Sequence, residues 1–379
     1  MTTRNNKLIA FACILVTLIF QSLRSQAQGL PCGNGHIDTA ADIKAMAYMA
    51  GPQIKGLQTV TYLVRVYFHV FNNNDGSNTA CSPAQVKTEF ASLLATYASD
   101  NICFINCGSE YINNTVINTT FNADDDSNGD AFAPYQVPNC INIFYLRTIK
   151  GNNTACNPPC GYGGIALGGI PGTFFLVASG NIGLGSTIGH EMGHCFGLLH
   201  TFETAHGYEK INGSNGSSSG DKVTDTPADP FAYNGQACYG TNNCQYFGYC
   251  ADPNGATNFS PPYTNLMSYW WGLRNAGNNF CFPNQVTTNG QFTRVNSFLN
   301  TDGDLQSCSS PSLLNISNLN IGLGHYMRSA IGFLTTTSTV SFYAVAEATL
   351  AADVVTLNPG FIAAPSTGGL VQILTKPCQ

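Results

Sequence analysis

Apolar residues recur with the periods of strands and helices from Tyr62 onward. Tyr62–Phe71 is β-branched and aromatic throughout and is followed by the turn-forming run Asn72–Gly76, which predicts a strand. A helix is expected next, because Ser82 can cap it, Pro83 suits its first turn and Gln85 completes a capping box. The apolar residues on one face of this helix are Val86, Phe90, Leu93, Leu94 and Tyr97.

Three more strands and a second helix are predicted further along. Short apolar runs indicate strands at Ile141–Leu146, Ile165–Leu167 and Phe174–Ala178. The helix begins near Ser186 and ends near Gly197, where glycine can take the left-handed conformation that closes a helix. The segment after this helix is irregular and polar.

The chain changes character from about Ser309. Val340–Ala344, Val354–Leu357 and Leu370–Leu374 read as short strands separated by turns, which indicates a small all-β module. We identify no long repeat in this part of the sequence.

The N-terminal segment has the pattern of a secretory signal peptide. Arg4 and Lys7 precede the apolar run Leu8–Phe20, and small residues end the segment at Ser25 and Ala27. The run is shorter than the roughly 20 residues that a membrane helix needs, and no later segment is long and apolar enough. We therefore expect a soluble protein that is secreted to the extracellular space.

Composition narrows the function further. Only 9% of the residues are charged, and 15 Lys and Arg against 21 Asp and Glu leave no positive surplus to bind a phosphate backbone, so nucleic acid is not an expected partner. The 15 cysteines, in an exported chain, indicate disulfide bonds.

One segment carries the chemistry: residues 190–200 match the pattern HExxHxxGxxH at every fixed position. His190 and His194 are one helical turn apart and share a face, and Gly197 allows a sharp turn that returns His200 as a third ligand. Three protein ligands leave one position of a tetrahedral Zn²⁺ open for water, as in catalytic zinc sites. Glu191 is then placed to act as the general base of peptide hydrolysis. The alternatives are a helix with incidental histidines and a vestigial site.

Here the chain resembles the metzincin zinc endopeptidases, and in particular the pappalysin (cytophagalysin) family. The resemblance runs from about Cys32 to Leu299. Besides the histidine motif, the segments that carry it are His200–Glu203, the Asp-Thr-Pro segment Gly220–Pro227, the Met-turn Asn265–Tyr269, and the upstream segments Tyr62–Phe71, Ile141–Ile143 and Gly161–Leu167.

The resemblance implies an α+β catalytic domain with a mixed twisted sheet, two long helices above the cleft and an irregular lower subdomain. Met267 would form a hydrophobic base beneath the zinc, and Tyr269 would donate a hydrogen bond to the oxyanion. The edge strand at Ile165–Leu167 would bind an extended substrate by strand addition. The expected organisation is a signal peptide (1–27), a pro-segment (28–57), a catalytic domain (58–305) and a C-terminal β module (311–379).

The family also implies roles for several cysteines. Cys32 would occupy the open zinc position in a latent zymogen, and an ordinary disulfide partner is the alternative. Cys250 and Cys281 resemble the disulfide that ties the loop after the zinc helix to the loop after Met267. Cys195 is expected to be a small buried residue.

A calcium site is implied near the Asp-Thr-Pro segment. Asp221, Asp225 and the oxygen atoms of Thr226 are hard ligands suited to Ca²⁺, and a solvated loop is the alternative for Asp221. The run Asp124–Gly129 imitates the start of an EF-hand, but Tyr135 stands where a bidentate glutamate belongs, so an acidic loop is expected there.

The sequence thus predicts a secreted zinc metalloendopeptidase, made as a zymogen, that acts on protein or peptide substrates and does not span a membrane. A rival interpretation is a catalytically silent metzincin-fold protein with a surface-binding or adhesion role, and a second rival is another metzincin family. The tail, through Asn358–Phe361 and Cys378, resembles short β modules at the C-termini of exported bacterial proteins.

Overall fold

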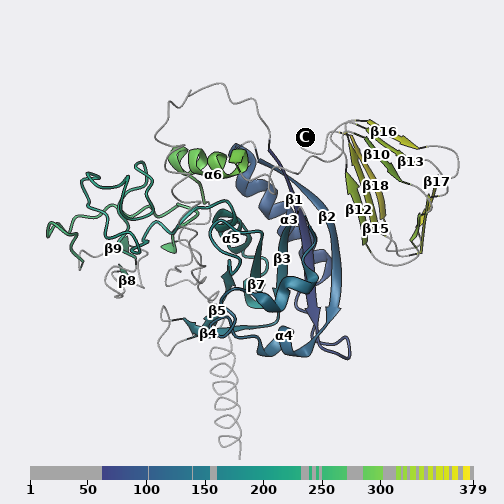
Figure 1. Cartoon of the computed structure of the whole chain (residues 1–379), viewed down its shortest axis with the longest axis horizontal. Coiled ribbons are helices and arrows are strands. Elements are labelled where there is room, and N and C mark those ends of the chain that lie inside the picture. Colours follow the sequence, from purple (N-terminus) through teal and green to yellow (C-terminus); the bar gives the residue numbers. More distant parts are fainter. Residues whose placement is uncertain are drawn as a thin grey trace, which may run out of the picture.

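The computed structural model describes residues 62–301, except 101, 139, 154–159, 232–238, 241–244, 247–249 and 271–284, and the strands of a C-terminal module between 313 and 375 (Figure 1). The predicted signal peptide and pro-segment lie outside the described residues, as do Cys32, Cys281 and Cys378.

A five-stranded sheet forms the centre of the larger part, in the order β2-β1-β3-β7-β6. The predicted strands appear as β1 (Tyr62–Asn72), β3 (Ile141–Leu146) and β7 (Phe174–Ala178), which pair in parallel. β2 (Ile102–Asn113) adds a parallel strand beside β1. The fifth strand, β6 (Gly164–Ile165), is antiparallel to β7 and forms one edge of the sheet.

Two of the four α-helices in the described residues follow the sequence prediction. α3 (Pro83–Tyr97) begins with the expected capping box, because Gln85 N donates to Ser82 Oγ and Ser82 N donates to the Gln85 side chain. α5 (Ser186–Cys195) is the predicted histidine helix. α4 (Thr115–Thr120) and α6 (Asn289–Thr301) were not predicted.

The remaining elements of the larger part are short. They comprise three 3₁₀ turns and four strands: η1 (Ala98–Asp100), η2 (Asp130–Tyr135), η3 (Ser179–Asn181), β4 (Ile149–Asn153), β5 (Cys160–Tyr162), β8 (Tyr239–Gly240) and β9 (Gln245–Tyr246). Among the described residues between α5 and α6, β8 and β9 are the only strands, so this segment is as irregular as its polar sequence indicates.

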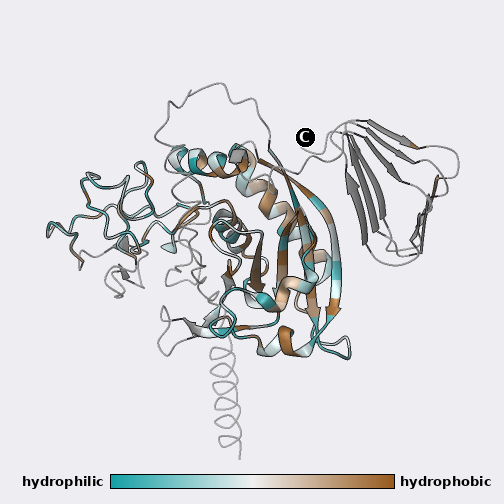
Figure 2. Ribbon diagram, viewed as in Figure 1, coloured by the Kyte–Doolittle hydropathy of each residue, from teal (hydrophilic) through white to brown (hydrophobic). Residues whose placement is uncertain are grey.

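The two faces of the sheet bury separate hydrophobic clusters. Alternate residues of β1, such as Val66 and Phe68, pack on one face with α3 and α5. The other face packs with α4 and η2 through residues such as Phe144. Figure 2 shows the same pattern, with hydrophobic strands in the sheet and a mostly hydrophilic segment between α5 and α6. The histidine helix therefore packs against both the sheet and its neighbour α3.

The predicted edge strand differs in position. Only Gly164 and Ile165 pair with β7, so the strand begins one residue earlier and ends two residues earlier than expected. The reason is that the chain leaves the sheet in a turn after Ile165, although Ala166 and Leu167 remain buried.

The C-terminal module consists of three parallel three-stranded sheets, β10-β13-β16, β11-β14-β17 and β12-β15-β18. Successive strands of one sheet are about 21 residues apart: Leu313 pairs with Phe333, and Phe333 pairs with Val354. The module is therefore a small parallel β-solenoid of three turns. The prediction that this region has no long repeat is wrong. The repeat lies in the spacing of the strands, and the residues at corresponding positions differ. Its strands are β10 (Leu313–Ile316), β11 (Leu319–Ile321), β12 (His325–Ser329), β13 (Phe333–Thr336), β14 (Val340–Ala344), β15 (Glu347–Ala352), β16 (Val354–Leu357), β17 (Phe361–Pro365) and β18 (Leu370–Thr375).

No helix in the described part of the chain has the length and apolar character needed to cross a bilayer.

Candidate metal centre

The turn after α5 is what brings the third histidine back. The chain leaves the helix at Gly197, which has a positive φ of 83°, and Leu198 N donates to Gly193 O. A Cβ at Gly197 would lie 1.8 Å from the Phe298 ring of α6, so no larger residue fits. The buried side chain of Arg294, also on α6, donates from Nε to Gly197 O over 2.7 Å. Helix α6 therefore fixes the turn that positions His200.

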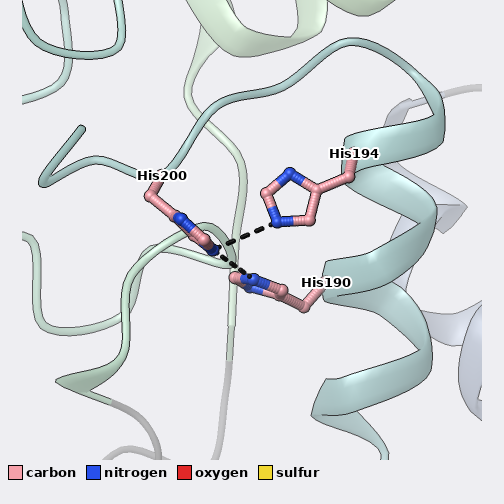
Figure 3. A group of neighbouring side chains, drawn as sticks. All are labelled: His190, His194 and His200. Atoms are coloured by element: carbon pink, nitrogen blue, oxygen red, sulfur yellow. Dashed lines mark hydrogen bonds between the residues drawn. The ribbon is translucent and has the colours of Figure 1, made fainter. Parts of the chain in front are cut away.

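The three histidines converge on one point (Figure 3). His200 Nε2 lies 3.0 Å from His190 Nε2 and 3.1 Å from His194 Nε2, and all three side chains are buried. Among the described residues they are the one group of three or more His, Cys, Asp or Glu side chains close enough to hold a metal ion together. Three imidazole nitrogens this close together suit a single transition-metal ion.

Backbone carbonyls select which nitrogen of two of these rings faces the centre. His190 Nδ1 donates to Leu266 O and His194 Nδ1 donates to Leu198 O, each over 2.8 Å. This assigns the proton to Nδ1 and leaves the Nε2 lone pairs directed at the shared point.

The electrostatics of the site favour neutral rings. Burial lowers the pKa of His194 to about 4. Burial, and then the neighbouring histidines, hold the pKa values of His190 and His200 well below the usual range. Neutral imidazole is the form that binds a metal, so the site is prepared for an ion at neutral pH.

Glu191 is buried beside these ligands and contacts the edge of the sheet. A Cβ placed on Gly164 of β6 would lie only 2.5 Å from Glu191 Oε1. The backbone of the edge strand therefore passes directly against this carboxylate, with no side chain between them.

The structure also brings Met267 and Tyr269 to the histidines. A Cβ on Gly193 would lie 2.5 Å from Met267 Sδ, which places the thioether against the histidine helix. The half-buried Tyr269 ring is centred 4.9 Å from the His200 ring and 5.6 Å from the His190 ring. Both residues thus lie beside the three histidines, and the roles that the resemblance gives them stay predictions.

Asp229, which the sequence analysis did not select, ties the surrounding loops together. Its buried carboxylate accepts hydrogen bonds from Thr201 Oγ1, from Ser268 Oγ over 2.8 Å and from Trp270 Nε1 over 2.8 Å. Phe231 N donates to the same group over 3.0 Å. Thr201 follows His200, and Ser268 and Trp270 flank Tyr269, so one carboxylate positions both sides of the metal centre. Its three side-chain partners are 28 to 41 residues distant along the chain, so only its proximity to the Asp-Thr-Pro segment could have drawn attention to it.

The residues expected to bind calcium do not all meet. Asp221 and Thr226 are buried together, with Thr226 Oγ1 2.9 Å from Asp221 Oδ1. The carboxylate of Asp225 is instead exposed and bound to the start of α6, where it accepts from Thr288 Oγ1 and Gly290 N. The carboxylate of Asp225 is therefore already bound at the start of α6 and makes no hydrogen bond with Asp221 or Thr226 among the described residues.

Glu209 takes the place of Asp225 beside Asp221. A Cβ on Gly220 would lie 2.9 Å from Glu209 Oε2, so this carboxylate lies against the residue that precedes Asp221. Burial raises the pKa of Asp221 to about 7, and burial together with Asp221 and Asp229 raises the pKa of Glu209 to about 8. Asp221 Oδ2 is buried without a hydrogen-bond partner among the described residues. A buried acidic pair of this kind suits a hard cation.

Other predicted residues have simpler outcomes. Cys195 is buried, as expected, and Cys250 is in a disulfide, but its expected partner Cys281 lies outside the described residues and the pairing stays a prediction. In the acidic loop, Asp124 accepts from Tyr162 Oη, and Asp126 accepts from two backbone amides. These carboxylates stabilise the loop itself.

No protein-family model matches the chain. It is 28% identical over 257 residues to an extracellular metalloprotease of Podospora anserina, an alignment that covers 62% of this chain and 72% of the relative. It is also 28% identical over 251 residues to an extracellular metalloprotease of Neurospora crassa, covering 59% of this chain and 80% of the relative. The chain is thus a distant relative of fungal extracellular metalloproteases. This similarity supports a metalloprotease family in general, without distinguishing pappalysins or metzincins from other metalloproteases.

Proposed function

We propose that the protein is a secreted zinc-dependent endopeptidase of the metzincin type, most similar to pappalysins, that hydrolyses peptide bonds in protein substrates. The observation that carries the proposal is the convergence of three buried, neutral imidazole nitrogens beside a buried glutamate. The relatives support a metalloprotease, and the signal-peptide pattern at 1–27 supports secretion.

The donor set fits zinc. Three imidazole nitrogens without a thiolate or a further carboxylate are the ligand set of catalytic zinc sites, and His190, His194 and His200 would hold the ion. When bound, zinc supplies Lewis-acid chemistry, which polarises the scissile carbonyl and makes water a stronger acid.

The chain's own residues supply the proton transfers and the positioning. Glu191 accepts a proton from the attacking water at its carboxylate and returns it to the leaving amine. The Tyr269 hydroxyl donates a hydrogen bond to the carbonyl oxygen as negative charge develops there. Met267 supports the histidine helix from below.

The substrate would bind along the edge strand β6. Among the described strands the outer edge of β6 has no partner, so it would offer backbone hydrogen bonds to an extended peptide. The contact between Gly164 and Glu191 supports a binding position for that peptide next to the general base. Recognition through main-chain atoms favours a protease that cleaves many sequences.

Calcium would bind at Asp221, Glu209 and Thr226. The unpaired Asp221 oxygen and the raised pKa values of both carboxylates support this assignment, because a cation would offset the mutual repulsion of two buried carboxylates. Asp225 is not part of this proposal, since α6 uses its carboxylate.

Latency of the zymogen is a separate proposal, which rests on the sequence alone. Cys32 would ligate the zinc in the zymogen, and full latency of a Cys32→Ala zymogen would refute it.

The decisive experiment measures casein cleavage by the purified secreted protein, with Glu191→Gln as the matched variant. We expect Glu191→Gln to lose at least a hundredfold in kcat while it still binds one zinc ion per chain. 1,10-Phenanthroline should abolish cleavage by the wild type, and added Zn²⁺ should restore it. Equal casein turnover by wild type and Glu191→Gln would refute the proposal that this site is a zinc endopeptidase with Glu191 as its general base. Zinc binding without any cleavage by the wild type would favour the silent surface-binding protein.

A further inference from the structure

The imidazole of His190 is oriented by a backbone carbonyl of the Met-turn. Nδ1 of this ring donates to Leu266 O over 2.8 Å, and both residues are buried. The direction of this carbonyl therefore decides how the ring presents Nε2 to the point that the three histidines share (Figure 3). Any group that holds the Leu266 carbonyl in place also holds a metal ligand.

Asn265 holds that carbonyl through the planar peptide bond. The Leu266 carbonyl and the Met267 N–H belong to one trans peptide unit, in which the two groups point in opposite directions. Met267 N donates to Asn265 Oδ1 over 2.9 Å. Rotation of the peptide plane would break this bond, so the Asn265 side chain fixes the direction in which Leu266 O points.

Gln291 of α6 holds the Asn265 amide in turn. The two buried side chains form a reciprocal pair, in which Gln291 Nε2 donates to Asn265 Oδ1 over 3.1 Å and Asn265 Nδ2 donates to Gln291 Oε1 over 2.8 Å. Backbone donors fix the orientation of both amides. Met267 N can only donate, so it requires the oxygen of the Asn265 amide. Thr288 N, 3.0 Å from Gln291 Oε1, requires the oxygen of the other amide in the same way.

The second histidine of α5 is oriented by a different route. His194 Nδ1 donates to Leu198 O, which lies in the turn that Arg294 of α6 holds. This route does not pass through the amide of Gln291. A change that begins at Gln291 should therefore reach His190 and spare His194, whereas a general loosening of α6 should disturb both ligands.

We propose that Gln291 is a positioning residue for the metal ligand His190. It acts through the Asn265 amide and the Leu266 carbonyl. Its effect is to keep the proton of the His190 ring on Nδ1 and the Nε2 lone pair directed at the ion. The inference rests on the proposed zinc site and deepens it, because it assigns a role in metal binding to a residue outside the ligand set. Loss of such an outer partner lowers metal affinity by about 10- to 100-fold.

Nitrogen NMR of the metal-free, full-length secreted protein tests the step at His190. In protein labelled with ¹⁵N-histidine, the chemical shifts of the ring nitrogens distinguish the Nδ1–H from the Nε2–H tautomer, and His190→Gln and His194→Gln assign the signals. We expect both rings of the wild type to carry the proton on Nδ1. In Gln291→Met, which keeps the side-chain length and removes the amide, His190 should become a mixture of tautomers while His194 stays unchanged. An Nε2–H tautomer of His190 in the wild type, or an unchanged His190 in the variant, would overturn the proposal.

Zinc affinity tests the consequence for the metal. In competition with a chromophoric chelator, Gln291→Met should raise the Kd for Zn²⁺ at least about tenfold. In an Asn265→Ala background the same substitution should change the Kd less than about twofold, because the link is already broken. Thr288→Ala is the matched control, since it removes the hydroxyl that caps α6 and leaves the amide pair intact, so its Kd should match that of the wild type. An equal loss of affinity in Thr288→Ala and Gln291→Met would point to a loosened helix and overturn the proposal.

The role of Gln291 and the proposed function fail on different results. A wild type that binds no zinc would refute the proposed function, and the tautomers of the metal-free protein would still decide the role of Gln291. A wild type that binds zinc and cleaves casein, beside a Gln291→Met that binds zinc as tightly, would refute the role of Gln291 alone. If Gln291→Met is not secreted, Gln291→Asn takes its place, because its side chain is one carbon too short to reach Asn265, and the same mixture of His190 tautomers is expected.

Discussion

At the scale of single residues, glycines at the metal centre leave space for functional atoms. A Cβ on Gly164 would meet Glu191, one on Gly193 would meet Met267, and one on Gly197 would meet Phe298. In each case the neighbour is a group that positions the metal ligands or acts beside them. A single added methyl group is therefore a sensitive probe of the geometry.

Gly164→Ala should impair catalysis more than folding. The new Cβ would force Glu191 Oε1 to move from a contact of 2.5 Å, and small displacements of a catalytic group lower rates by about a hundredfold. We expect kcat for casein to fall by about that factor, and the Tm to fall as well, because the same Cβ would lie 2.9 Å from Thr187 Cγ2. Gly180→Ala is the matched control, because a Cβ there meets nothing within 4 Å. Equal activity of both variants would contradict this role of Gly164.

A second residue-scale prediction concerns Glu89, which is buried on α3 and accepts from Gly183 N over 2.7 Å. Burial raises the pKa of Glu89 to about 7. Between the unfolded pKa and this value the folded state keeps a proton that the unfolded state has lost, so stability falls as pH rises through this window. We expect a loss of roughly 3 kcal/mol between pH 4.5 and 7.5 from this group. Urea unfolding at several pH values should show a flatter profile for Glu89→Gln, and parallel profiles would refute the assignment.

At the scale of elements, the metal centre is assembled from segments joined by polar side chains. Arg294 binds α6 to the turn after α5, and Asp229 binds the segment after His200 to the Met-turn. Apart from α6, these segments are irregular, so their positions depend on these bonds more than on backbone pairing of their own. Loss of one bond should move a whole segment.

Asp229→Ala should therefore destabilise the protein and disturb catalysis together. It leaves the buried donors of Thr201, Ser268 and Trp270 without acceptors, which costs about 3 kcal/mol or more. We expect a lower Tm and a kcat that falls more than KM changes. Asp229→Asn keeps one carbonyl oxygen toward Trp270, so it should recover much of both losses. An alanine variant with unchanged kcat would rule out a positioning role.

Calcium should distinguish the two aspartates. After dialysis against EGTA at pH 8, added Ca²⁺ should raise the Tm of the wild type and of Asp225→Ala, but not that of Asp221→Asn. Asp225→Ala should lose about 1 kcal/mol with or without Ca²⁺, because it removes acceptors at the start of α6. If added Ca²⁺ did not raise the Tm of Asp225→Ala, Asp225 would be a calcium ligand after all.

Elements with local signals were predictable, whereas those that depend on distant partners were not. The capping box at Ser82 and the spacing of His190 and His194 are local, and both helices form as expected. α6 has a local signal that was missed, since Thr288 and Gln291 form a capping box. β2 is recognisable only from its pairing with β1, and its polar Asn106 and Ser109 hide it. The local sequence of Asp225 could not reveal that α6, 63 residues later, binds its carboxylate.

At the scale of the whole molecule, metal binding should be coupled to folding. The ligands come from α5 and from the chain beyond its turn, and they converge only in the folded state. A ligand at 1,000 times its Kd stabilises the native state by about 4 kcal/mol. We expect chelation of the zinc to lower the Tm by roughly 10 °C, with recovery on adding Zn²⁺. Glu191→Gln should show the same shift and His194→Ala should not. A Tm that does not change on chelation would contradict metal binding by the three histidines.

The stacked strands of the C-terminal module have a consequence for how such a protein can change length. In a solenoid each turn contacts mainly the turns beside it, so a turn of about 21 residues can be gained or lost by duplication or deletion without rearranging the others. The larger part, whose sheet and helices depend on contacts far apart in sequence, has no comparable freedom. Evolution could therefore lengthen or shorten this module by whole turns, while the arrangement of His190, His194 and His200 stays unchanged.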